Sequence, residues 1–105
     1  MSEGVERFAA LVEKDPRNHL ARFSLAKNLY DAGSFAQAAE HFGLALQARP
    51  DWMMARILLG KCQLAQGDRD QARLSFQEGL RLAIAQSHEG PKEELETLLK
   101  EMAQA

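Results

Sequence analysis

Three histidines, one cysteine and several carboxylates are the side chains in this sequence that could do metal or acid–base chemistry. Metal ligation needs several such groups to converge on one ion. His19, His41 and His88 never form a pair four residues apart, and none of them lies one helical turn from Cys62. We therefore expect surface or boundary histidines and no metal site.

Nucleophilic chemistry has no better support in the sequence. Ser24 and Ser75 have no Ser–His–Asp context, and there is no G-x-S-x-G motif or glycine-rich phosphate loop. Cys62 has no histidine or group of cations beside it, so we expect a small apolar residue between helices rather than a reactive thiol. The acids near the C-terminus are typical of the solvated face of a helix: Glu93, Glu94 and Glu96. We predict a protein without catalytic residues and without a cofactor.

The composition is that of an ordinary water-soluble domain, with 46% hydrophobic and 27% charged residues in a chain of 105. The net charge of −2 disfavours nucleic acid, which requires clustered cations. No apolar run approaches the ~18 residues of a membrane span, and the first four residues do not resemble a signal peptide. A single cysteine cannot form an internal disulfide and fits a reducing compartment. We therefore predict a cytoplasmic protein with no nucleic-acid or membrane partner.

A repeat with a period of 34 residues organises the chain. Phe8, Phe42 and Phe76 fall at this interval. Other residues recur at the same offset, and the pairs are Pro16 and Pro50, Leu25 and Leu59, Gly33 and Gly67, Ala38 and Ala72, and Leu46 and Leu80. So many matches at one offset indicate a repeated structural unit.

Each unit has the pattern of two amphipathic helices, with apolar residues three and four positions apart. The first unit predicts helices over residues 18–32 and 35–48, separated by a sharp turn at Gly33. The second unit predicts a helix over residues 52–66, with Asp51 as its N-cap. The sequence therefore predicts paired helices that bury their apolar faces against one another.

Two sets of residues carry a family pattern. The first set is Leu25, Ala26, Tyr30, Gly33, Phe35, Ala38, Phe42, Ala45, Leu46 and Pro50. The second set is Leu59, Gly60, Gly67, Asp68, Ala72, Phe76 and Leu80. Both resemble the tetratricopeptide repeat. The resemblance implies an all-α fold, a right-handed superhelical stack of antiparallel helix pairs (an α-solenoid) with about six helices.

The resemblance covers most of the chain and implies one domain over residues 1–105. Residues 1–18 are similar to the second half of a repeat. Full repeats are expected over 19–52 and 53–86, and a C-terminal capping helix within 87–105.

The sequence departs from the family at two kinds of position. Arg22 and Arg56 stand at the fourth position of the first helix of each repeat, where the family prefers an aromatic residue. Ile84 stands where a third proline would fall. The second helix of that repeat should therefore continue to about Ser87, and Gly90 should end it.

A closing helix is expected over residues 91–104, with Pro91 in its first turn. One apolar stripe on this helix would cover the end of the stack, and it comprises Leu95, Leu98, Leu99 and Met102. A repeat stack needs such a cap because each repeat buries its face only against its neighbours.

In the family, certain positions of the first helix of each repeat face a concave groove. Here they form an apolar floor with two lysines in register, and they are Leu20, Phe23, Lys27, Tyr30, Asp31, Met54, Ile57, Lys61, Leu64 and Ala65. Steps of three and four residues place such positions on one side of a helix. Burial of several of them as ordinary core, under the closing helix or by tighter packing, is the alternative.

Two functions follow from this pattern. The first is a non-catalytic adaptor or scaffold that binds a peptide or helix of a partner protein in the groove, with Lys27 and Lys61 favouring an acidic flank. The second is a homo-oligomerising scaffold subunit, possible as a homodimer, that pairs through an exposed apolar patch around Trp52, Met53 and Met54.

Overall fold

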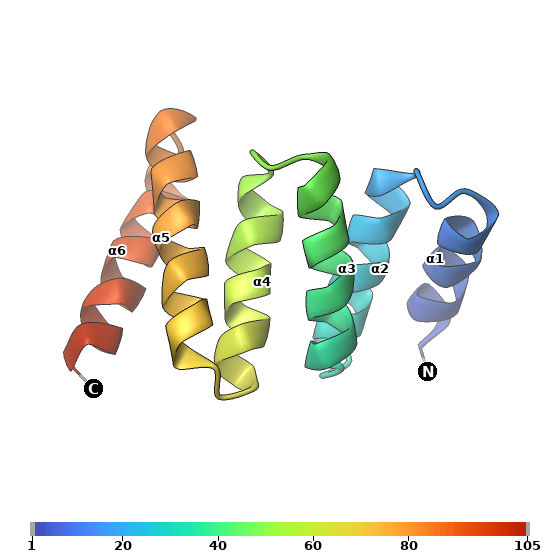
Figure 1. Cartoon of the computed structure of the whole chain (residues 1–105), viewed down its shortest axis with the longest axis horizontal. Helices are drawn as coiled ribbons and strands as arrows, with labels where there is room; N and C mark the ends of the chain where they lie inside the picture. Colours follow the sequence, from blue (N-terminus) through green and yellow to red (C-terminus); the bar gives the residue numbers. More distant parts are fainter. Residues whose placement is uncertain (1, 105) are drawn as a thin grey trace.

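The computed structural model describes residues 2–104, and these residues form six α-helices joined by short turns. The helices are α1 (Glu3–Lys14), α2 (His19–Asp31), α3 (Phe35–Ala48), α4 (Met53–Ala65), α5 (Arg69–Ala85) and α6 (Glu89–Gln104). Helices that are neighbours in the sequence pack against each other, and α2 also touches α4. Figure 1 shows the result, a row of helices about 42 Å long with the two termini at opposite ends. The predicted all-α stack of about six helices is confirmed.

Three helices begin at a residue whose side chain caps the first turn. Oxygens of Ser2, Asn18 and Asp68 accept hydrogen bonds from backbone N–H groups three residues later, at 3.2, 3.0 and 3.3 Å. These bonds satisfy N–H groups that have no partner within the helix. The predicted cap at Asp51 is wrong, because α4 begins one residue later and its N-cap is Trp52, which makes no side-chain capping bond.

Three helices are followed, two residues after their last residue, by a residue in the left-handed conformation, and these are Gly33 (φ 79°), Gly67 (φ 82°) and Ser87 (φ 59°). In each case the next backbone N–H reaches back to a carbonyl of the last turn at 2.9 Å, and the pairs are Ser34 to Leu29, Asp68 to Gln63 and His88 to Ala83. The expectation that Gly90 ends the fifth helix is wrong, because Ser87 already provides this stop. Gly90 and Pro91 instead lie in the first turn of α6, where a proline removes only an N–H that has no helical partner.

The left-handed conformation of Ser87 lets us predict how a substitution there changes the stability of the protein. Ser87→Gly should raise the free energy of unfolding by about 0.5–1 kcal/mol, because this conformation costs a residue with a Cβ about 1–2 kcal/mol and the more flexible unfolded glycine chain offsets part of the gain. Chemical denaturation measures the difference. Ser34→Gly is the matched control, since its φ of −86° gains nothing from glycine. Equal stability of Ser87→Gly and the parent protein would contradict the prediction.

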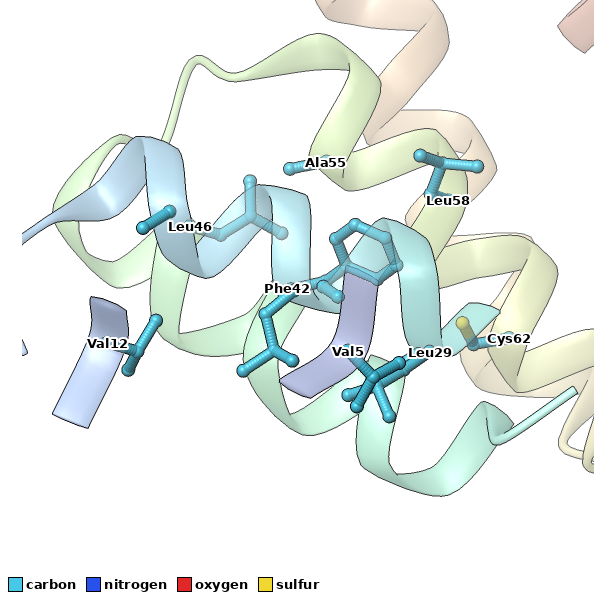
Figure 2. Close-up of a cluster of buried hydrophobic side chains, with 12 residues drawn as sticks. Val5, Val12, Leu29, Phe42, Leu46, Ala55, Leu58 and Cys62 are labelled. Carbon is cyan, nitrogen blue, oxygen red and sulfur yellow. The ribbon is translucent and has the colours of Figure 1, made fainter. Parts of the chain in front are cut away.

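Two clusters of buried side chains form the core, one around Phe42 and one around Phe76. Both phenylalanines are completely buried. Figure 2 shows the first cluster, in which Phe42 lies among side chains from four helices, including Val5, Leu29, Leu46 and Leu58. The second cluster joins α4, α5 and α6 through Met53, Ile57, Phe76, Leu82 and Leu95. Phe8 is only half-buried, because among the described helices α1 packs on α2 alone.

Candidate interaction surface

Apolar side chains at equivalent positions of α2 and α4 remain exposed. Leu20 on α2 and Met54 on α4 lie 34 residues apart in the chain, and their exposed fractions are 67% and 42%. Phe23 follows Leu20 by three residues and therefore lies on the same side of α2. We refer to Leu20, Phe23, Trp52 and Met54 as the α2–α4 surface.

An aromatic stack gives this surface its shape. The rings of Phe23 and Trp52 are stacked, with their centroids 4.6 Å apart and their planes at 18°. Phe23 also meets the buried Phe42 edge-on at 5.7 Å. On Trp52, the guanidinium of Arg49 lies 4.6 Å from the ring centroid, which is a cation–π distance. The N-cap residue of α4 is thereby fixed to α2 and connected to the core.

A depression of about 370 Å³ lies beside Met54. Its lining comes from the connection between α3 and α4, the start of α4 and the connection between α5 and α6, and comprises Arg49, Asp51, Trp52, Met53, Met54, Gln86 and His88. The side-chain amide of Gln86 donates to the carbonyl of Asp51 at 2.9 Å and ties the two connections together. The α2–α4 surface is therefore continuous with a hollow at one end of α4.

The remaining apolar groove positions are less accessible. Tyr30 is half-buried and meets Phe35 edge-on at 5.6 Å, while Asp31 is exposed. Ile57 is only 3% exposed and belongs to the second core cluster, and the half-buried Leu64 packs against that same cluster. The exposed apolar candidates, Leu20 and Met54, thus lie near the N-terminal ends of α2 and α4, and Ile57 lies in the core.

Both groove lysines form ion pairs. Lys27 Nζ lies 2.9 Å from a carboxylate oxygen of Asp31, one turn along α2. Lys61 Nζ lies 2.9 Å from Glu94 Oε1, so this ion pair links α6 to the C-terminal half of α4. The two cations in register therefore have different partners, one local and one from the closing helix.

Sequence reasoning did not include Arg49 and His88 in the surface, and it assigned Trp52 to a separate self-association patch. Within that patch Met53 is 7% exposed and Met54 is 42% exposed, so Met54 is the most accessible member. The one available signal was the period itself, which aligns Trp52 with the capping residue Asn18. A tryptophan at an N-cap indicates packing rather than capping.

Burial shifts the pKa of two potentially reactive groups, Cys62 and His41. Cys62 is buried, and burial raises the pKa of its thiol to about 11, so it stays protonated near neutral pH. Burial also lowers the pKa of His41, as does the charge of Arg22 to a smaller extent. Among residues 2–104, no three His, Cys, Asp or Glu side chains are grouped to hold a metal ion. No helix in that range is long and apolar enough to span a membrane.

Comparison with protein families gives matches that together cover residues 2–83. Two tetratricopeptide repeat models match, one over residues 2–51 and the other over residues 29–83. The chain belongs to the tetratricopeptide repeat family. Repeats of this family are generally protein–protein interaction modules and are typically non-catalytic.

Individual relatives agree with this assignment. This tetratricopeptide repeat chain is 33% identical to the TPR repeat-containing protein PA0015 of Pseudomonas aeruginosa, over its whole length and 97% of that protein. It is 28% identical over 75 residues to the tetratricopeptide repeat and J domain-containing co-chaperone DNJ1 of Fusarium oxysporum f. sp. lycopersici, of which it spans 14%. The solution structure of protein BPP2914 from Bordetella parapertussis is similar with a TM-score of 0.84 and 32% identity, covering 99% of this chain and 90% of that one.

Proposed function

We propose that this protein is a non-catalytic adaptor that binds a peptide or helix of a partner protein on the α2–α4 surface. The observation that carries the proposal is the exposure of Leu20 and Met54 at equivalent positions of successive repeats. The stacked rings of Phe23 and Trp52 add a rigid aromatic wall. Aromatic and methionine side chains are enriched in protein interfaces, and methionine adapts its shape to different partners.

The charged groups around this surface would orient the partner. Lys27 and Lys61 keep 45% and 34% of their side chains exposed although each is paired. An acidic flank of the partner would share these cations with Asp31 and Glu94, and would improve orientation and association rate more than affinity. Tyr30 would contribute contact area, whereas Ile57 and Leu64 would support the floor from beneath.

Met54→Asp tests the proposal. A charge at this position should weaken partner capture at least about fivefold, because losing a central apolar contact removes more than about 1 kcal/mol of binding free energy. The thermal melting temperature should change little, since exposed substitutions usually alter stability by less than about 0.5 kcal/mol. The measurement is capture from native lysate, together with photo-crosslinking from position 54 to identify what is captured.

Leu74→Asp is the matched control. Leu74 lies on α5, outside the α2–α4 surface, and its exposed fraction of 57% is similar to that of Met54. Capture should survive this change, and a photo-crosslinker at position 74 should not yield the same product. Capture that persists in Met54→Asp and is lost in Leu74→Asp would place the binding surface on α5.

Self-association is the second candidate function. The exposed Met54 beside Trp52 would also serve contact with another copy of the chain. Light scattering on the purified protein separates the two functions, because only self-association gives a dimer without a partner. In that case Met54→Asp should return the protein to a monomer.

A further inference from the structure

Two arginines at equivalent positions of successive repeats differ in how the protein satisfies them. Arg22 Nη2 donates to the carbonyl of Pro16 at 3.1 Å, and Arg22 Nη1 lies 3.1 Å from His41 Nδ1. Arg56 lies 34 residues later, and its Nε is buried without a hydrogen-bond partner among the described residues. A buried guanidinium N–H without an acceptor is costly, so a ligand oxygen that this N–H reaches when the Arg56 side chain turns toward solvent removes that cost.

Arg56 lines a pocket of about 470 Å³ on α4 and α5. The other lining residues are Pro50, Asp51, Glu78 and Arg81. Arg56 follows Met54 by two residues, which is about 200° around the helix. The pocket therefore lies on the side of α4 that faces away from the α2–α4 surface.

Glu78 is the internal counter-ion of this pocket. Arg81 Nε donates to Glu78 Oε1 at 2.7 Å. This hydrogen bond, and then the charges of Arg81 and Arg56, hold the pKa of Glu78 below its usual value, so the carboxylate is ionised at neutral pH. Glu78 thus accepts its hydrogen bonds from Arg81, and the buried Nε of Arg56 has no acceptor among the described residues.

We propose that this pocket binds an oxyanion, a carboxylate or a phosphate group, through the guanidinium of Arg56, with Arg81 as the second cation. The planar fork of an arginine matches the two oxygens of such a group with parallel N–H bonds. Because Asp51 and Glu78 balance the two arginines, binding is weak and depends on direct hydrogen bonds to Arg56. Glu78 competes with the ligand and sets its affinity.

The test follows the Nε–Hε signals of Arg56 and Arg22 by NMR while sodium acetate or sodium phosphate is added at constant ionic strength. The Arg56 signal should shift and saturate, whereas the Arg22 signal should not, because that side chain already has its partners. Saturation with acetate identifies a carboxylate site, and saturation with phosphate alone identifies a phosphate site. An equal, unsaturated drift of both signals in both titrations would overturn the proposal.

Variants of the pocket residues show whether the pocket itself binds the oxyanion. Glu78→Gln removes the internal competitor and should tighten oxyanion binding about tenfold. Glu96→Gln changes the net charge equally at a site on α6 and should leave binding unchanged. Arg56→Lys keeps the charge but loses the planar fork, and should weaken binding about tenfold. Equal affinities of the Glu78→Gln and Glu96→Gln proteins would overturn the proposal even if Arg56→Lys failed to fold.

Discussion

Replacing Phe42 by alanine should lower the free energy of unfolding by about 3–5 kcal/mol, because a completely buried phenylalanine leaves both a lost transfer free energy and a cavity. Phe42 belongs to a core cluster with side chains from α1, α2, α3 and α4, and its ring meets Phe23 edge-on. The loss is a large part of the ~5–15 kcal/mol that stabilises a typical domain. Chemical denaturation monitored by circular dichroism measures it.

Phe8→Ala is the internal control for this prediction. Phe8 occupies the same phase of the 34-residue period, but it is only half-buried. Its replacement should cost about 1–2 kcal/mol, because less apolar surface returns to water and the cavity is open. Equal losses for the two variants would mean that α1 is covered in solution by something that these residues do not form, such as a second copy of the chain.

A chain that ends at His88 lacks α6 and should lose the second core cluster. Leu95 is completely buried, and Leu98, Leu99 and Met102 pack on the same cluster. Truncating Leu95 to alanine alone should lower the free energy of unfolding by about 2–5 kcal/mol. Removing the whole helix exposes more apolar surface and should lower it further. Ile57, Phe76 and Leu82 would become accessible, so we expect increased binding of a hydrophobic dye and aggregation on heating.

The ion pair between α6 and α4 contributes much less to the free energy of unfolding than the apolar contacts of α6. Glu94→Gln removes the partner of Lys61, but the two side chains are 52% and 34% exposed, so the cost should be at most about 1 kcal/mol. A thermal melt compares this variant with the truncated chain. A truncated protein that is monomeric and as stable as Glu94→Gln would show that α6 is not needed to close the stack.

The sequence alone determined the repeat and the helix boundaries that depend on local chemistry. The 34-residue spacing of Phe8, Phe42 and Phe76 predicted the stack, and two of these rings became the centres of the two core clusters. Gly33 and Gly67 ended helices as expected, because a left-handed residue after a helix is a local requirement that glycine meets at least cost. Such signals can be read along the chain since cause and effect lie within a few residues.

The prediction for Gly90 was wrong because the left-handed residue after the fifth helix is not a glycine. The left-handed conformation is open to other residues at a cost of about 1–2 kcal/mol, and Ser87 adopts it where the last two helices meet. No glycine marks this turn in the sequence. The packing of α6 against α5 offsets the conformational free-energy cost of this turn.

Only the tertiary structure decided which side chains of the candidate surface are accessible. Met54 and Ile57 have the same apolar character and lie one turn apart on α4, yet one is 42% and the other 3% exposed. Contacts between distant segments make this difference, because Leu95 of α6 joins Ile57 in the second core cluster while Trp52 stacks on Phe23 beside the exposed end of α4. Periodicity within one helix specifies which residues share a face, but the helices that pack against that face determine how much of it reaches the solvent.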